Sequence, residues 1–122
     1  MSHLIISLGK DQKDHTYKII QKFDNIYIIS DGNSEFDPAV INPKHKISLL
    51  LLPKIGAKGL VDALFYELKS QLLKDKITDL DIAVNISSGS GLVHSAIIAA
   101  VMKLGYGIRL VDIDEKNELI EL

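Results

Sequence analysis

The sequence has no cysteine, no tryptophan and only three prolines among its 122 residues. The lack of cysteine excludes disulfide bonds and thiolate metal sites. No apolar run is long enough to span a bilayer as a helix. Neither sign of charge dominates, since 14 Lys and Arg stand against 16 Asp and Glu for a net charge of −2. A broad surface for long nucleic acids is therefore not expected, although a local basic pocket for a small polyphosphate is compatible with this balance.

The composition is that of one globular domain, with 47% hydrophobic and 25% charged residues. A chain of this length forms one core, so we expect a single domain over residues 1–122. Met1–Leu4 contains neither a basic segment nor a signal-peptide cleavage site. The expected location is cytoplasmic, with no membrane partner.

Five apolar segments, each followed by turn residues, predict β-strands: His3–Leu8, Asn25–Ser30, Ile47–Leu52, Leu80–Ile86 and Ile108–Ile113. Apolar residues at helical spacing predict helices over Lys13–Phe23, Leu60–Lys74 and Leu92–Leu104. Phe36–Lys46 contains two prolines and is predicted to be a loop with one short helical turn. Residues 118–122 are predicted to pair with the last strand as an edge hairpin. The pattern predicts an α/β fold, with a Rossmann-like, mostly parallel sheet, three helices and a C-terminal edge β-hairpin.

The polar turn between the fourth strand and the third helix is the first candidate site. A helix that begins at the carboxyl end of a parallel strand presents unpaired N–H groups and partial positive charge, which favours an anion. Gly89 and Gly91 would let a ligand approach the backbone, and Ser87, Ser88 and Ser90 carry hydroxyls that could bond a phosphate. The alternative is that these serines only cap the helix.

A second turn follows the first strand at Gly9, between Ser7 and Lys10. In a parallel sheet it would lie at the same carboxyl edge, where open α/β sheets bind ligands. Lys54 and Lys58 bracket a glycine in the loop after the third strand and would face that edge too. Solvated loop lysines are the alternative interpretation.

Several common sites are absent from the sequence. Gly89-Ser90-Gly91 with His94 is an incomplete dinucleotide fingerprint near the end of the chain, and no Gly-Lys-Ser/Thr of a P-loop precedes the helix. The Gly-x-Ser-x-Gly turn of hydrolases is also missing, and the four histidines are scattered. We expect no cofactor and no metal.

The predicted helix over residues 92–104 is apolar around most of its circumference. Such a helix is buried on most sides. In a small domain one side would pack on the sheet and the other on a second copy of the chain, which predicts a homodimer.

The segment Asn85-Ile86-Ser87-Ser88-Gly89-Ser90-Gly91 resembles the Asn-hydrophobic-(Thr/Ser)-Gly-Gly-(Thr/Ser)-(Lys/Arg) turn of CARF domains, the CRISPR-associated Rossmann-fold sensors. The resemblance implies a stand-alone domain that binds cyclic oligoadenylate, with cyclic tetra-adenylate expected, at a homodimer two-fold in type III CRISPR defence. Ser88 replaces the usual first glycine, and Gly91 replaces a basic residue. The implied ligand-binding residues are Gly9, Asn85, Ser87, Ser88, Gly89, Ser90, Gly91, Lys54 and Lys58.

Some CARF-type proteins are ring nucleases, which align a ribose 2′-hydroxyl with the adjacent phosphate. The candidate catalytic residues are His94, one turn into the helix, together with Ser7 and Lys10. Any cleavage would be metal-independent. A histidine with no chemical role, a buffer that sequesters the messenger and a sensor that acts through another protein remain open. So does a non-catalytic nucleotide- or phosphate-binding regulatory subunit outside CRISPR.

Overall fold

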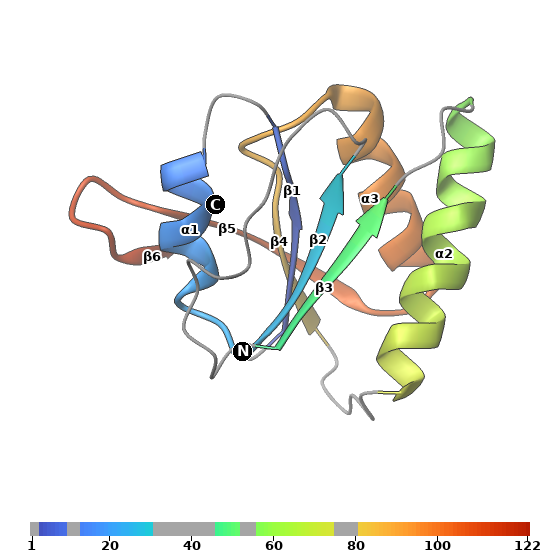
Figure 1. Cartoon of the computed structure of the whole chain (residues 1–122), viewed down its shortest axis with the longest axis horizontal. Coiled ribbons are helices and arrows are strands. Elements are labelled where there is room, and N and C mark those ends of the chain that lie inside the picture. Colours follow the sequence, from blue (N-terminus) through green and yellow to red (C-terminus); the bar gives the residue numbers. More distant parts are fainter. Residues whose placement is uncertain (1–2, 10–12, 31–45, 52–55, 75–80) are drawn as a thin grey trace.

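The computed structural model describes residues 3–9, 13–30, 46–51, 56–74 and 81–122 (Figure 1). The described strands and helices follow the order that the sequence predicts: β1 (His3–Ser7), α1 (Lys13–Ile20), β2 (Asn25–Ser30), β3 (Lys46–Leu51), α2 (Ala57–Lys74), β4 (Asp81–Asn85), α3 (Gly91–Lys103), β5 (Gly107–Ile113) and β6 (Leu119–Glu121). The loop predicted over Phe36–Lys46 lies outside the described residues, except that Lys46 begins β3.

The six strands form one sheet in the order β3-β2-β1-β4-β5-β6. The pairs β1–β2, β1–β4, β2–β3 and β4–β5 are parallel, and β5–β6 is antiparallel. This confirms the mostly parallel sheet with a hairpin at its C-terminal edge. The strand order reverses between β1 and β4, and ligands in open α/β sheets bind at such a switch point.

The sheet has a different helical layer on each face (Figure 1). Alternate residues of the central strands point to opposite faces, so Ile5 and Val84 pack with α2 and α3, whereas Leu4 and Ile6 pack with α1. Both clusters are almost fully buried. The strands therefore read as continuous apolar runs because both of their faces are covered.

Two helix boundaries differ from the prediction by three residues, and α3 begins and ends one residue earlier than predicted. After Ile20 the N–H groups of Lys22 and Phe23 bond to carbonyls three residues back, at 3.0 and 3.1 Å, which tightens the chain and ends α1 three residues early. Helix α2 begins at Ala57 rather than Leu60, and Leu60 N–H donates to Gly56 O at 3.0 Å. Lys58 consequently lies in the first turn of α2 and not in a loop.

Within the described ranges, no helix combines the length and the apolar character that crossing a membrane requires.

Candidate functional site

Two glycine turns meet at the carboxyl edge of the sheet, beside the switch point. A Cβ atom added to Gly9 would lie 2.6 Å from the backbone nitrogen of Gly89, a distance that real Cβ atoms do not tolerate. Gly89 has a φ of +96°, and a Cβ there would lie 3.3 Å from Ser7 Cβ. Both positions thus need glycine, one for close approach and one for its backbone conformation. The expectation that the two turns share one edge is confirmed.

The carbonyl oxygen of Ser88 holds this arrangement together. It accepts hydrogen bonds from Ser7 Oγ and from His94 Nε2, the latter at 2.7 Å. Ser7 is fully buried and His94 is partly buried. A carbonyl can only accept, so Nε2 of His94 carries a proton, and in the neutral imidazole the lone pair is then on Nδ1. The structure thus brings together Ser7, Ser88 and His94, three of the predicted site residues.

Helix α3 starts in the turn with a well-formed N-cap. Ser90 is extended, with φ −92° and ψ 158°, and its Oγ accepts from Val93 N–H at 3.3 Å. The capping interpretation therefore holds for Ser90. Gly91, the first helical residue, is exposed, and an added Cβ would meet nothing within 4 Å. The first turn contains no acidic residue, so no carboxylate from it offsets the partial positive charge of this helix end.

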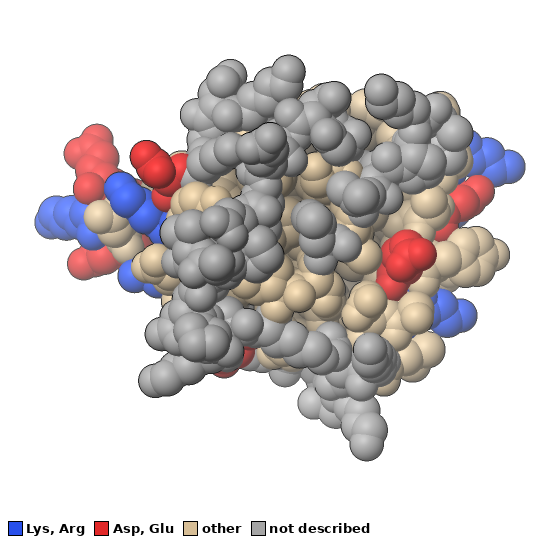
Figure 2. Space-filling model, in the orientation of Figure 1, with Lys and Arg blue, Asp and Glu red and all other residues tan. Residues whose placement is uncertain are grey.

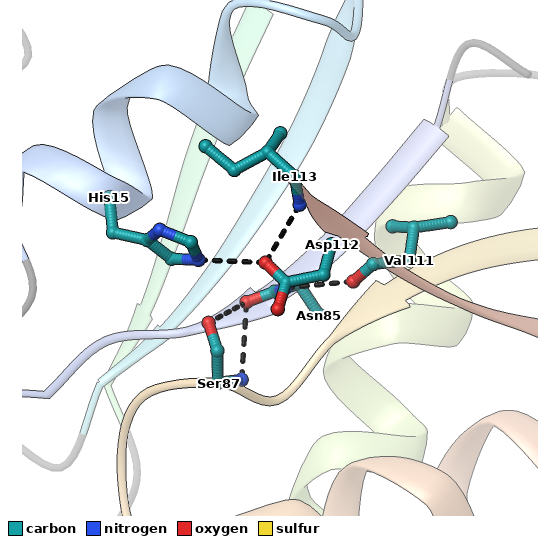
Figure 3. A network of polar contacts seen from close by, with 6 residues as sticks. All are labelled: His15, Asn85, Ser87, Val111, Asp112 and Ile113. Atoms are coloured by element: carbon teal, nitrogen blue, oxygen red, sulfur yellow. Dashed lines mark hydrogen bonds and ion pairs between the residues drawn. The ribbon is translucent and has the colours of Figure 1, made fainter. Parts of the chain in front are cut away.

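A polar network extends the site from β4 to β5 and α1 (Figure 3). Asn85 Oδ1 accepts from Ser87 Oγ at 2.7 Å and from Ser87 N–H at 3.3 Å, while Asn85 Nδ2 donates to Val111 O at 2.8 Å. Asn85 is 2% exposed. Both the oxygen and the nitrogen of its side-chain amide bond within the protein, so Asn85 positions the turn through Ser87. A direct contact between Asn85 and a ligand stays a prediction.

Asp112 is the second centre of this network. Its Oδ1 accepts from Ile113 N–H at 2.8 Å, from His15 Nε2 at 2.7 Å and, at a longer 3.5 Å, from Asn85 Nδ2 (Figure 3). His15 and Asp112 are partly exposed, with 32% and 26% of their side chains accessible. Neither was predicted as a site residue. They lie 97 positions apart, so no local motif joins them, and only the packing of α1 against β5 could have indicated the pair.

The predicted lysines contribute less to the described site. Lys58 is exposed in the first turn of α2, and Lys10 and Lys54 lie outside the described residues. On the face in Figure 2 the described charges of both signs are interspersed, over the β5–β6 hairpin at one end and over α2 at the other. Within the described part of the chain, no group of three or more His, Asp or Glu residues could hold a metal ion.

No protein-family model matches the sequence, and no curated protein matches it either. The fold is similar to that of Enterococcus italicus Csm6 in a solved structure of that protein bound to cyclic hexa-2′-fluoro-hexa-dAMP. The match has a TM-score of 0.61 at 16% sequence identity and covers 93% of this chain. It covers 34% of the Csm6 chain, so this chain spans about a third of that protein's length. At this level of identity the comparison shows that the two chains share an α/β fold.

Proposed function

We propose that this domain binds a cyclic oligoadenylate at the two-fold axis of a cytoplasmic homodimer, in type III CRISPR antiviral defence. The observation that carries the proposal is the pair of glycine turns packed together at the switch point, beside the N-terminus of α3, whose first turn has no acidic residue. Backbone N–H groups there suit phosphate oxygens, as does the Ser90 hydroxyl, which accepts the capping bond and can still donate its own proton. The CARF-like turn sequence and the fold similarity to a protein bound to a cyclic adenylate analogue agree with this ligand.

The homodimer has its own support in the surface of α3. Met102 is 66% exposed and Leu92 is 47% exposed, although both are large and apolar. Part of the apolar surface of α3 is covered by α2 within the same chain, which reduces but does not remove the need for a partner. A two-fold axis beside α3 would bring two copies of the Ser88–Gly91 turn around one ligand, which suits a ring with an even number of nucleotides. Cyclic tetra-adenylate and the six-unit ring both satisfy this symmetry.

The test is a binding comparison across five probes: cyclic tetra-adenylate, cyclic hexa-adenylate, a linear oligoadenylate, AMP and inorganic phosphate. The proposal expects one of the two rings to bind at least tenfold more tightly than the linear oligomer, because a ring is preorganised for two symmetric turns. It also expects one ring per two chains in isothermal titration. Comparable affinity for AMP and for both rings, at one ligand per chain, would instead support the nucleotide-binding regulatory subunit.

A further inference from the structure

The His15–Asp112 pair has the geometry of an acid–base dyad. Asp112 accepts through Oδ1 from His15 Nε2 at 2.7 Å. A carboxylate next to Nε2 places the neutral imidazole's proton on that nitrogen, so its lone pair is on Nδ1. The same carboxylate would stabilise the imidazolium formed when Nδ1 takes up a proton. Orientation by an acidic partner is what makes a histidine an efficient general base.

The carboxylate is itself held in place. Asp112 Oδ1 receives the Ile113 N–H at 2.8 Å and approaches Asn85 Nδ2 at 3.5 Å, and Asn85 bonds in turn to both polar groups of Ser87. The dyad is therefore linked through one residue to the turn that carries the proposed ligand site. An ion pair that merely fastened α1 to β5 would not need this connection.

The second histidine of the site has a different environment. His94 Nε2 donates to the Ser88 carbonyl at 2.7 Å, and that carbonyl also accepts from Ser7. A neutral carbonyl stabilises an imidazolium less than a carboxylate does. Of these two histidines, His15 is thus the better supported proton acceptor, and His94 holds the turn.

We propose that His15 is the general base of a ring-opening reaction on the bound cyclic oligoadenylate and that Asp112 is its positioning residue, an inference that rests on the proposed function. His15 Nδ1 takes the proton of a ribose 2′-hydroxyl, the 2′-oxygen attacks the adjacent phosphorus, and the bond from phosphorus to the 5′-oxygen breaks. The 5′-oxygen takes a proton from water, and His15 returns its proton to water. The product is a linear oligoadenylate with a 2′,3′-cyclic phosphate and a 5′-hydroxyl, and no redox partner is needed.

The experiment measures single-turnover cleavage of labelled cyclic tetra-adenylate and cyclic hexa-adenylate by the full chain in EDTA, with binding measured in parallel. His15→Ala should slow cleavage by roughly a hundred- to ten-thousand-fold while binding changes by less than about threefold, and added imidazole should restore part of the rate. Asp112→Asn should lower the rate with little change in affinity. Asp81→Asn is the matched control, because Asp81 is also a partly exposed carboxylate in an ion pair, with Arg109 at 3.4 Å, but begins β4 at the opposite edge of the sheet.

The pH profile separates chemistry from structure. Of the described charged groups, Asp112 is the one paired with His15, while Asp14 and Lys18 on the same helix are exposed. Wild-type cleavage should fall as pH falls, because a protonated imidazole cannot accept the 2′-proton. The residual cleavage rate of His15→Ala should no longer fall with pH. His3→Ala is the control, because His3 lies at the amino edge of the sheet, and its cleavage rate should still fall as pH falls.

The outcomes are distinguishable. Failure of both rings to bind would overturn the proposed function and this inference with it. Binding without cleavage would leave the proposed function standing and overturn the dyad. Cleavage at the wild-type rate by folded His15→Ala would also overturn the dyad. So would a loss of rate that is accompanied by neither imidazole rescue nor a changed pH profile. Either result would return the catalytic role to His94.

Discussion

Gly91 offers a way to separate binding from folding with a single charge. It is the first residue of α3, it is exposed, and an added Cβ meets nothing within 4 Å. Either Gly91→Lys or Gly91→Glu should therefore fit without rearrangement. Gly91→Lys would also place a basic residue where the CARF turn that this segment resembles carries one.

The two variants should have opposite effects on stability and on affinity. At a helix N-terminus a carboxylate stabilises and an ammonium destabilises by about 0.3–1 kcal/mol, so Gly91→Glu should melt higher than Gly91→Lys. A unit charge about 5 Å from a phosphate contributes about 1 kcal/mol in a water-like dielectric and about 3 kcal/mol at an effective dielectric constant of 20. Gly91→Lys should thus tighten binding of a cyclic oligoadenylate by about five- to 150-fold, and Gly91→Glu should weaken it by a similar factor.

The assay is isothermal titration of both variants at two salt concentrations, with melting temperatures recorded for each. The charge effects should shrink at high salt because of screening. Leu73→Lys and Leu73→Glu are the controls, since Leu73 is 71% exposed near the C-terminal end of α2, away from the carboxyl edge. If the Gly91 and Leu73 pairs change affinity equally, only net charge matters and the ligand does not lie at the α3 N-terminus.

Three further variants test the fold and assembly. Ser90→Ala removes the N-cap of α3 and should cost about 1 kcal/mol, or about 4 °C in Tm for a domain of this size; an unchanged melting temperature would mean that the Val93 hydrogen bond contributes nothing. Gly9→Ala should cost about 1–3 kcal/mol because its Cβ meets the backbone of Gly89, whereas Gly91→Ala should not, and equal chemical-denaturation midpoints would refute that packing argument. Met102→Glu should leave the monomer folded and dissociate the dimer in sedimentation, and a wild-type monomer at micromolar concentration would remove the dimer proposal.

Local sequence patterns predicted the elements well where packing and propensity agree. Asn25–Ser30 is strongly β-branched and aromatic, and its predicted bounds match β2. The start of α2 was predicted three residues late because Gly59 has a poor helix propensity. Its neighbours Leu60 and Leu64 pack into the core, and this burial outweighs the cost of one glycine in the first turn.

In the candidate site, too, the sequence predicted the features that depend on neighbouring residues and missed those that depend on distant ones. The glycine and serine turn was visible because strand, turn and helix follow one another in sequence, and a serine just before a helix is a common N-cap, as Ser90 is. The role of Asn85 as a structural support was not visible, because its partner Val111 lies on a strand that joins β4 only in the fold. His15 and Asp112 were missed for a similar reason, because α1 packs against β5 only in the fold. Pairing of side chains across long separations depends on strand order, which local periodicity does not encode.

Helix α1 has only eight residues, a length at which an isolated helix is marginal in water. It is held by the burial of Thr16, Ile19 and Ile20 and by the contact of His15 with β5. Transient local unfolding of α1 would expose its amides to hydrogen exchange more often than those of the central strands, and each opening would break the His15–Asp112 pair. A ligand that binds only the closed arrangement must slow exchange along the whole of α1, in proportion to its concentration above its Kd. The shortest helix of the described fold would then report occupancy of a site formed mainly by other elements.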